Sequence, residues 1–521
     1  MKKINDRAII LVFLISSGFI QVKSQGINAH ELDSLVEKTL KMFEVPGMAV
    51  AIIKDGSVIH SKGYGVRSLH SRQKVDENTL FGIASNSKAF TAAALAILSE
   101  QGKLKLNDKV TDYIPEFKLY DPYVTEAFSI KDLLTHRSGL GLGAGDLMFW
   151  PDSADFTKKD IIHNLRYLKA VSPFRTKYDY DNLLYIVAGE IVSRVSGMNW
   201  EDFIESNILK PLGMTKSAAN YNRLEDKTNV IDPHAPINGE VKVIRRDFSE
   251  TADAAGGIYS SITDMSKWVI MQLNKGKFGN GMGKQLFTET AQEEMWTPQT
   301  IIPVHGINDY NTHFAGYGLG WFLADEKGYK QVSHTGGLAG IVTQVTLIPE
   351  LKLGIIVFTN QQSTAAFRVV TNTIKDSYYG MAPKDRVKQY HDQVIKADMD
   401  AKKITDAIWA DITAQQKVSK TRPDPSLYTG VYSDIWFGEV TISTVEDKLW
   451  FTAKKSPRLT GEMLPYKGNT FIVKWNDRSM DADAYVMFSL DNSGKATSIK
   501  MKPISPLTDF SFDFQDLDFK R

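Results

Sequence analysis

The spacing of apolar residues divides the chain into a mixed first part, a charged helical segment and a β-rich end. Apolar residues recur at helical spacing over 25–43, and Pro46-Gly47 ends that pattern. Two short apolar runs follow, at 48–53 and 58–65, on either side of the turn sequence Lys54-Asp55-Gly56. This order predicts an N-terminal helix followed by a β-hairpin.

The next apolar run, 89–98, contains neither Gly nor Pro and predicts a buried helix. Ser85 lies at the head of this run, and Lys88 follows one helical turn later on the same face. A Ser hydroxyl becomes a nucleophile when a neighbouring base takes its proton, and a Lys whose pKa is lowered by burial can be that base. The helix N-terminus would add partial positive charge where the alkoxide forms.

The pattern Ser-x-x-Lys occurs twice in the chain, so it does not identify a catalytic site by itself. Ser71 and Lys74 form the other copy, in the polar stretch 69–78 with no apolar helix behind it. We interpret that copy as a solvated loop. For Ser85 the structural alternative is a helix N-cap, with Lys88 pointing into solvent.

The middle of the chain is predominantly helical. Apolar patterns predict short helices at 108–114 and 130–139, each ended by a break, and longer helices at 183–195 and 199–209. His136 lies in the second short helix. A His at such a helix end is more often a hydrogen-bonded structural group than a catalytic one, and we assign it to that class.

Strand-like runs return after this helical part. They occupy residues 317–322, 330–336, 341–348 and 353–359, and short turns join them. Adjacent runs of this kind predict an antiparallel meander, and a helix follows to about residue 379. The expected fold class is therefore α+β, an antiparallel sheet flanked by helices with an inserted helical subdomain.

The end of the chain has a different pattern. Residues 384–419 are charged, have few apolar positions and predict a helical arm or linker, and 420–425 breaks that helix. From Leu427 onward, apolar and polar residues alternate at short intervals, which predicts a small all-β barrel or sandwich. Aromatic residues that we assign to its core are Tyr428, Tyr432, Trp436, Phe437, Trp450, Phe451 and Trp475. The predicted units are 1–24, 25–382, 383–425 and 426–521.

Residues 1–24 have the pattern of a secretory signal peptide. A basic start with Lys2, Lys3 and Arg7 precedes the apolar run 8–20, and the expected cleavage site follows Ser24. The apolar run is short for a membrane span, although an uncleaved anchor is the alternative. No other stretch is long and apolar enough for a span. We therefore expect a secreted or periplasmic protein without a stable membrane span.

Composition narrows the expected chemistry. The formal net charge of +1 gives no reason to expect nucleic acid or an anionic membrane as a partner. The chain has no Cys, which excludes disulfides, thiolate metal sites and a Cys nucleophile. The ten His residues show no HExxH pair or other tight metal spacing. We expect a metal-free protein that needs no cofactor and whose partner is a small-molecule or peptide substrate.

Three separated stretches occur in the order of a known family. Ser85-x-x-Lys88 opens a buried helix, Tyr180-Asp181-Asn182 precedes a second one, and His334-Thr335-Gly336 ends a strand of the meander. With the flanking sequences LLTHRSGL, AAGGIYSSITDMSKW and YGLGW, the chain resembles the serine penicillin-recognising enzymes. That group includes class C β-lactamases, D-alanyl-D-alanine carboxypeptidases, D-aminopeptidases and related esterases. The resemblance covers roughly residues 32–379 and favours Ser85 as the nucleophile.

The resemblance implies that Ser85 attacks the substrate and forms an acyl-enzyme. Lys88 and Tyr180 would share the work of base and proton shuttle, because a Tyr beside an ammonium can have its pKa lowered. The sequence leaves open which of the two takes the first proton. The structural alternative for Tyr180 is a side chain packed in the core.

The resemblance also implies a set of binding groups. Asn182 would hold Lys88 and the amide oxygen of the substrate, unless it is a helix cap. The stretch His334-Thr335-Gly336 would contact the substrate, unless His334 is a structural residue at the strand end. The backbone N–H groups of Ser85 and Gly337 would form the oxyanion hole.

Two positions depart from the family pattern. Asp181 stands where the family usually has a small residue, and it would add negative charge near the site if its side chain points inward. His334 stands where most β-lactamases have Lys. Unlike Lys, a His is largely neutral at neutral pH unless a carboxylate such as Asp181 raises its pKa. A neutral His334 would weaken the grip on the carboxylate of a β-lactam.

These features predict an exported serine hydrolase that acts on an amide or peptide bond, D-amino-acid peptides included, or on an ester. One alternative is a penicillin-binding sensor that is acylated without efficient turnover, and another is a β-lactamase. The C-terminal part resembles the small lipocalin-like barrel appended to some family members. It would form a barrel core, shield the Ser85 cleft or drive formation of a homo-oligomer.

Overall fold

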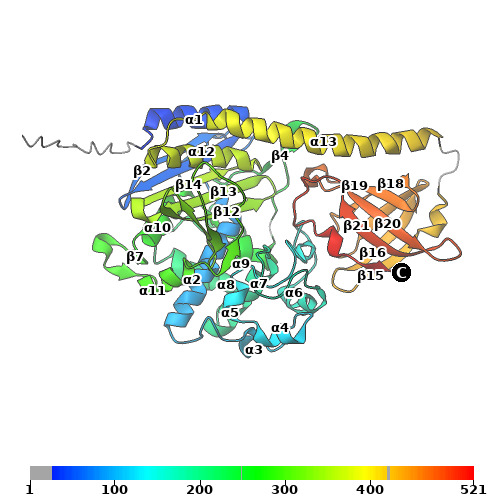
Figure 1. The fold of residues 1–521 in the computed structure, drawn as a ribbon, viewed down its shortest axis with the longest axis horizontal. Helices are drawn as coiled ribbons and strands as arrows, with labels where there is room; N and C mark the ends of the chain where they lie inside the picture. Colours follow the sequence, from blue (N-terminus) through cyan, green and yellow to red (C-terminus); the bar gives the residue numbers. More distant parts are fainter. Residues whose placement is uncertain (1–25, 248, 419–422) are drawn as a thin grey trace, which may run out of the picture.

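A computed structural model describes residues 26–247, 249–418 and 423–521 (Figure 1). The predicted signal peptide lies outside these residues, as do residues 420–422 of the predicted break at 420–425. We call 26–381 the sheet domain and 423–521 the barrel. A long helix connects the two (Figure 1).

An antiparallel sheet of eight strands organises the sheet domain, in the order β2-β1-β14-β13-β12-β11-β10-β9. Its strands are β1 (Gly47–Lys54), β2 (Ser57–Gly65), β9 (Thr300–Ile302), β10 (Ala315–Tyr317), β11 (Phe322–Glu326), β12 (Tyr329–Leu338), β13 (Ile341–Ile348) and β14 (Leu353–Thr359). The predicted hairpin and meander are both confirmed. Pairing of β1 with β14 joins them into one sheet.

Helices cover both faces of this sheet. One face carries α1 (Ala29–Met42), α12 (Thr364–Tyr378) and the start of α13 (Arg386–Val418), and the other carries α2 (Ser87–Glu100) and α10 (Ile262–Leu273). In β1, Val50 and Ile52 pack on the first face while Ala49 and Ala51 pack on the second. Because both faces are buried, β1 is a continuous apolar run instead of an alternating one.

The inserted helical part lies between β2 and β9. Its helices are α3 (Val110–Tyr113), α4 (Pro122–Ala127), α5 (Ile130–Leu133), α6 (Lys158–Asn164), α7 (Leu183–Ser196), α8 (Trp200–Ile204) with a π-turn at Glu205–Leu209, α9 (Asp253–Gly256) and α11 (Glu289–Met295). The helices predicted at 183–195 and 199–209 are confirmed. The one predicted at 130–139 ends earlier, because His136 has a left-handed backbone with φ of +51° that cannot continue a helix.

Three small two-stranded pairings complete the sheet domain. They are β3 (Phe81–Gly82) with β6 (Tyr259–Ser260), β4 (His234–Ile237) with β5 (Glu240–Val243), and β7 (Lys277–Phe278) with β8 (Lys284–Gln285). The first of these links the segment before Ser85 to the segment before α10.

The predicted charged linker is a single helix, α13, that passes over the gap between the two domains (Figure 1). Near its start, Val387 is buried with residues of α1 and α12. Near its end, Ile408 and Ile412 pack against Ile472 and Ile504 of the barrel. Buried apolar residues thus anchor α13 at both ends, while Ile395, Met399 and Ile404 between them are exposed.

The C-terminal part is a closed barrel of eight antiparallel strands, which confirms the predicted all-β unit. The strands are β15 (Gly430–Asp434), β16 (Gly438–Val445), β17 (Lys448–Ala453), β18 (Thr460–Lys467), β19 (Thr470–Trp475), β20 (Ala484–Leu490), β21 (Ala496–Pro503) and β22 (Phe519–Lys520). Tyr432, Phe451 and Trp475 fill the interior as predicted. Trp450 is an exception and is half-buried, because neighbours on a strand point to opposite faces.

Arg458, between β17 and β18, fixes the barrel to the sheet domain. Its guanidinium donates to Asp247 Oδ1 at 2.8 Å and to the carboxylate of Asp152, both in the sheet domain, and to Asp477 Oδ2 at 2.7 Å in the barrel. The side chains of Asp152 and Asp247 are only 2% and 4% exposed. A buried guanidinium is therefore shared by two buried acidic side chains of the sheet domain, and burial together with the neighbouring Asp152 raises the pKa of Asp247.

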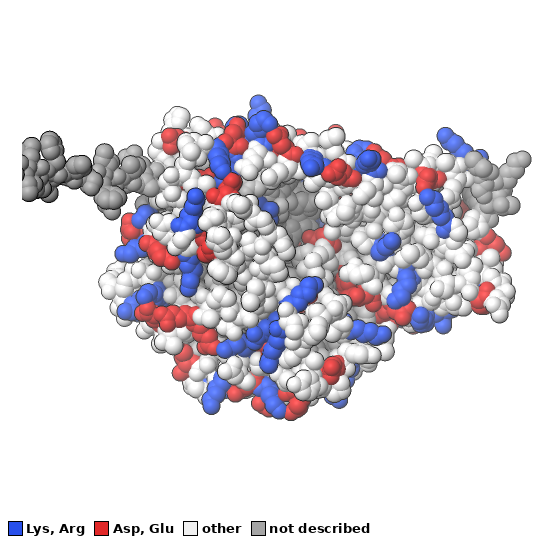
Figure 2. Space-filling model, in the orientation of Figure 1, with Lys and Arg blue, Asp and Glu red and all other residues white. Residues whose placement is uncertain are grey.

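The surface of the molecule has mixed charge. On the face in Figure 2, acidic and basic side chains are interspersed, and the face is hollowed between the two domains beneath α13. Across the described ranges, no helix combines the length and the apolar character that crossing a bilayer requires.

Replacing Arg458 with Ala would leave the Asp152 and Asp247 carboxylates buried without their shared cation, although Arg245 still contacts Asp152. We expect the free energy of unfolding to fall by about 3–5 kcal/mol, the usual result of breaking a buried ion pair by removing one partner. Denaturant titration followed by Trp fluorescence measures this loss. Lys454→Ala, which breaks an exposed barrel pair with Glu439, is the matched control. That control should lose less than about 1 kcal/mol, and an equal loss in both variants would contradict the assignment.

Candidate active site

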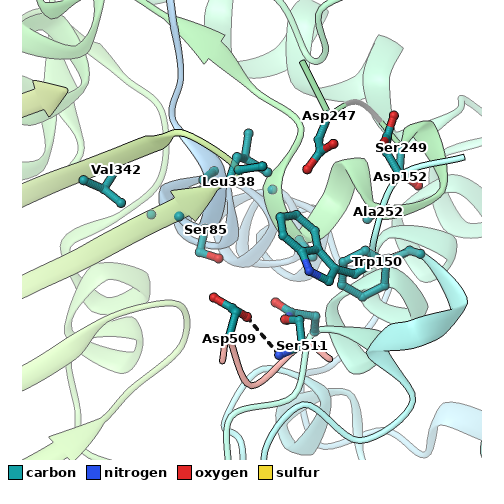
Figure 3. A pocket seen from close by; sticks show the side chains of 18 of the residues that line it. Ser85, Trp150, Asp152, Asp247, Ser249, Ala252, Leu338, Val342, Asp509 and Ser511 are labelled. Carbon is teal, nitrogen blue, oxygen red and sulfur yellow. Dashed lines mark hydrogen bonds between the residues drawn. The ribbon is translucent and has the colours of Figure 1, made fainter. Parts of the chain in front are cut away.

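A pocket of about 760 Å³ lies between the two domains, and Ser85 is part of its wall (Figure 3). The sheet domain contributes the turn before α2, the end of β12 and the segment that precedes α7. The barrel contributes Arg458, Leu507 and residues 479–481 and 509–512. Much of the wall is aromatic, with Phe149, Trp150, Tyr178, Tyr180, Tyr221, Phe322, Phe510 and Phe512.

A fixed turn presents Ser85 to this pocket. Asn86 Nδ2 donates to Ile83 O at 3.1 Å and to Thr343 Oγ1 at 2.9 Å, and Thr343 Oγ1 donates to Ile83 O at 2.9 Å. Between them, Ala84 has a left-handed backbone with φ of +50°. That conformation costs a non-glycine residue about 1–2 kcal/mol, so these hydrogen bonds to β13 hold a strained turn in place.

Lys88 is fully buried one turn after Ser85. Its Nζ lies 3.1 Å from Ser85 Oγ, 2.7 Å from Asn182 Oδ1 and 3.0 Å from Ala255 O. Burial lowers the pKa of Lys88 to about 7, although the carboxylates of Asp146 and Asp181 act to raise it. A neutral amine can donate to Asn182 and Ala255 and direct its lone pair at the Ser85 hydroxyl. The alternative of an N-cap with a solvated Lys is therefore wrong.

Tyr180 lies on the other side of Ser85. Its backbone carbonyl accepts from Gly143 N at 2.8 Å, and its side chain lines the pocket with Ser85. Burial raises the pKa of Tyr180 well above its ordinary value, and the nearby Ser85 only partly offsets this. The expected lowering by an ammonium is wrong, because burial of the phenol dominates its pKa. Lys88 Nζ lies over the ring face, 4.7 Å from its centroid. Tyr180 is thus a neutral phenol at neutral pH.

Asn182 connects Lys88 to a buried carboxylate. Its Oδ1 accepts from Lys88 Nζ at 2.7 Å, and its Nδ2 donates to Asp146 Oδ2 at 2.8 Å. Its side chain makes no capping bond to α7, so the cap alternative does not hold. The expected contact with Lys88 is confirmed, and Asn182 also lines the pocket.

Asp181 does point inward and is fully buried. Its Oδ1 accepts from Leu184 N at 3.4 Å, and its own backbone N–H donates to His136 Nδ1 at 3.1 Å. Burial raises the pKa of Asp181 to about 7. The His136 ring packs 4.2 Å from the Tyr180 ring between centroids, so His136 is a structural support, as predicted.

His334 lies on β12 with both ring nitrogens occupied. The Tyr317 hydroxyl donates to Nε2 at 2.9 Å, and Nδ1 donates to Thr335 O at 2.5 Å in the neutral tautomer that this pattern requires. Burial and the nearby Lys88 lower the pKa of His334 to about 3. The idea that Asp181 makes His334 a cation is therefore wrong. His334 is neutral.

Two glycines at the end of β12 bring this strand against the Ser85 turn. A Cβ on Gly336 would lie 2.2 Å from Ile83 O, so no larger residue fits there. A Cβ on Gly337 would meet no atom within 4 Å, because this position is open to the pocket. Thr335 also lines the pocket and is half-buried. The backbone of Gly337 and that of Ser85 thus border the same space, as the predicted oxyanion hole requires.

The sequence did not indicate two groups of the site. Asp146 is fully buried, and its Oδ2 accepts from both Asn182 Nδ2 and Ser511 Oγ, each at 2.8 Å. Phe510 packs against Tyr180 with 5.9 Å between ring centroids. The stretch GLGAGD that ends at Asp146 is an unusual Gly-rich signal. Nothing local in the sequence connects residues 510 and 511 to the site.

Two further predictions concern the other Ser-x-x-Lys copy and metal binding. Ser71 and Lys74 are exposed and outside any helix, which confirms a solvated loop. Within the part of the chain that the structure describes, no cluster of three or more His, Cys, Asp or Glu side chains is arranged to hold a metal ion.

Comparison with known proteins gives two family matches. Residues 32–379 match the family described as Beta-lactamase, and residues 415–521 match a domain of unknown function (DUF3471). The unguisins hydrolase ungD of Aspergillus violaceofuscus is 29% identical over 463 residues, covering 83% of this chain and 80% of the relative. Protein flp of Staphylococcus aureus is 25% identical over 371 residues, covering 70% of each chain.

Solved structures share the fold. The octameric penicillin-binding protein homologue from Pyrococcus abyssi has a TM-score of 0.61 at 22% identity, covering 95% of this chain and all of its own. A class C β-lactamase from Rhodobacter sphaeroides has a TM-score of 0.54 at 20% identity, covering 66% of this chain and 98% of its own. With the matched region, residues 32–379, including Ser85 and nearly all of the sheet domain, the chain belongs to the β-lactamase family of serine hydrolases.

Proposed function

We propose that the protein is an exported hydrolase that cleaves an amide, peptide or ester bond through an acyl-enzyme on Ser85, with Lys88 as the general base. The observation that carries this proposal is the 3.1 Å contact between Lys88 Nζ and Ser85 Oγ, made by an amine whose pKa is about 7. A base needs its pKa near the working pH to accept a proton efficiently. The raised pKa of Tyr180 makes it the weaker candidate for that step.

In the proposed reaction, the Ser85 proton passes to Lys88 Nζ while Oγ forms a bond to the carbonyl carbon. Backbone N–H groups of Ser85 and Gly337 stabilise the oxyanion. Tyr180, a neutral phenol in the same pocket wall, donates its proton to the leaving group and regains one from Lys88. Water then cleaves the acyl-enzyme by the reverse sequence of proton transfers.

The charge of the pocket supports substrates without a carboxylate near the reacting bond. His334 is neutral, and of the two arginines in the wall, Arg458 is paired with buried carboxylates. The wall has six acidic side chains, but burial raises the pKa of four of them, Asp247, Asp253, Asp481 and Asp509. The preference for substrates without a carboxylate therefore rests on the neutral His334. Our proposed order is neutral amides, D-residue peptides among them, then neutral esters, and then β-lactams.

Export and self-association are also part of the proposal. Export rests on the signal-peptide pattern of residues 1–24. Self-association, with the barrel as contact, is suggested by the octameric state named for the pyrococcal homologue. Light scattering on the purified chain tests the second point.

A fluorophosphonate probe should form one covalent adduct, on Ser85, identified by mass spectrometry of the labelled peptide. Ser85→Ala should remove the adduct, while Ser71→Ala, in the other Ser-x-x-Lys copy, should label as the wild type does. Lys88→Ala should lower kcat on a p-nitrophenyl ester by at least about 100-fold, the usual size of general-base catalysis. Stoichiometric labelling of the wild type without ester turnover would favour the sensor instead.

The proposal also predicts how kcat/KM depends on pH. Lys88 acts as a base only when unprotonated, so kcat/KM on a neutral ester should rise with pH and level off above about 7. Below that value it should fall about tenfold per pH unit. The measurement is a pH series of initial rates with a substrate that does not itself titrate. A kcat/KM profile with no acidic limb near pH 7 would contradict Lys88 as a base with a lowered pKa.

His334 should have no charge-dependent role. For the wild type, pH profiles on a carboxylate peptide and on a neutral ester should therefore be parallel. His334→Lys should improve the carboxylate substrate relative to the ester by about tenfold, because a charge-assisted hydrogen bond contributes about 1.5 kcal/mol. His313→Lys, outside the pocket, is the control for added charge. A wild-type carboxylate profile that alone declines with rising pH would contradict a neutral His334.

A further inference from the structure

The loop between β21 and β22 of the barrel reaches the polar groups behind Lys88. Ser511 Oγ donates to Asp146 Oδ2 at 2.8 Å, and Asp513 Oδ2 accepts from Gly145 N at 2.6 Å. Ser511 is held in turn by its backbone N–H, which donates to Asp509 Oδ1 at 2.9 Å (Figure 3). Two buried barrel residues, Ser511 and Asp513, therefore hydrogen bond to consecutive residues of the sheet domain.

Four hydrogen bonds connect this loop to the nucleophile. They run from Ser511 Oγ to Asp146 Oδ2 (2.8 Å), from Asn182 Nδ2 to the same oxygen (2.8 Å), from Lys88 Nζ to Asn182 Oδ1 (2.7 Å) and between Lys88 Nζ and Ser85 Oγ (3.1 Å). The other carboxylate oxygen of Asp146 is buried and has no hydrogen-bond partner among the described residues. The orientation of Asp146 thus depends on Ser511 and Asn182.

The direction of the Asn182 amide is the critical feature of this chain. Asn182 can present either its oxygen or its NH₂ group to Lys88, and only the oxygen accepts from an amine. An acceptor at Asp146 Oδ2 selects the NH₂ group and so turns the oxygen toward Lys88. Ser511, by donating to the same atom, keeps that acceptor aimed at Asn182.

We propose that Ser511 is a positioning residue of the catalytic site, and that the barrel thereby completes the machinery that holds Lys88 against Ser85. The proposal rests on the proposed function in which Lys88 is the base. It assigns the barrel a part in the chemical step, beyond its contribution to the pocket wall.

The electrostatic consequence has a definite sign. Burial raises the pKa of Asp146, and the hydrogen bond from Ser511 lowers it, so losing Ser511 depletes the charged carboxylate. That charge acts to raise the pKa of Lys88, so its loss lowers the pKa of Lys88 further. The other titratable groups facing Lys88 or Asp146 are Asp181, His136, His334, Tyr180, Tyr185 and Asp513. All of them stay in place when Ser511 is replaced.

The test measures kcat, KM and the pH midpoint of kcat/KM on a neutral p-nitrophenyl ester, with the full-length protein. For Ser511→Ala we expect kcat to fall about tenfold or more with little change in KM, because a displaced base affects the chemical step. The midpoint should also move to lower pH. Ser511→Thr keeps the hydroxyl and should restore both values, whereas Ser511→Val, of the same shape, should not. Ser505→Ala, in the same loop but outside the pocket wall, should match the wild type.

Each outcome decides a separate claim. An inactive wild type would refute the proposed function itself. An active wild type with an unchanged kcat in Ser511→Ala and Ser511→Val would refute the positioning role alone, even if both variants lost thermal stability. A lower kcat with an unshifted midpoint would refute only the electrostatic part. Should Ser511→Ala not fold, the Thr and Val pair gives the same comparison. In Asp146→Asn, adding Ser511→Ala should shift the midpoint no further, and an additional shift of equal size would show that Ser511 does not act through Asp146.

Discussion

The burial of one amine is the constraint on which the rest of this structure depends. Lys88 is fully enclosed, and a buried ammonium is costly unless it is paired or loses its proton. The structure surrounds it with two carboxylates that favour the charged form and enough apolar wall to favour the neutral one. The balance leaves the pKa near neutrality. The Ala-rich α2, the helical insertion and the position of Asn182 all serve that enclosure.

A second constraint is the close contact between the Ser85 turn and the end of β12. The turn includes a strained Ala84, and hydrogen bonds from β13 hold it. Gly336 lets the strand lie directly against it. Because β12 and β13 are neighbours at the centre of the sheet, the nucleophile and the open backbone at Gly337 are fixed to the same rigid element. Little reorganisation is needed to bring them together.

The sequence predicted this site well where motif and local structure coincide. Ser85 and Lys88 are three residues apart where a 3₁₀ turn continues into α2, so their contact follows from helical spacing. The apolar run around His334 predicted its strand. The pKa of Tyr180 could not be predicted, and the sequence left the charge of His334 open, since both depend on how deeply each ring is buried and on where Lys88 lies. Asp146 and Ser511 were missed because their contact joins residues from different domains. The one-turn length of α5 depended on the left-handed backbone at His136.

The anchoring of α13 at both ends has a consequence for how strongly the barrel loop must bind. A helix fixed to the sheet domain by Val387 and to the barrel by Ile408 and Ile412 permits little relative movement. The effective concentration of the loop at its docking position is therefore very high. Contacts such as the one between Ser511 and Asp146 therefore form even when each of them is weak by itself. Substitutions in this loop can accordingly change the chemistry of the site without releasing the barrel.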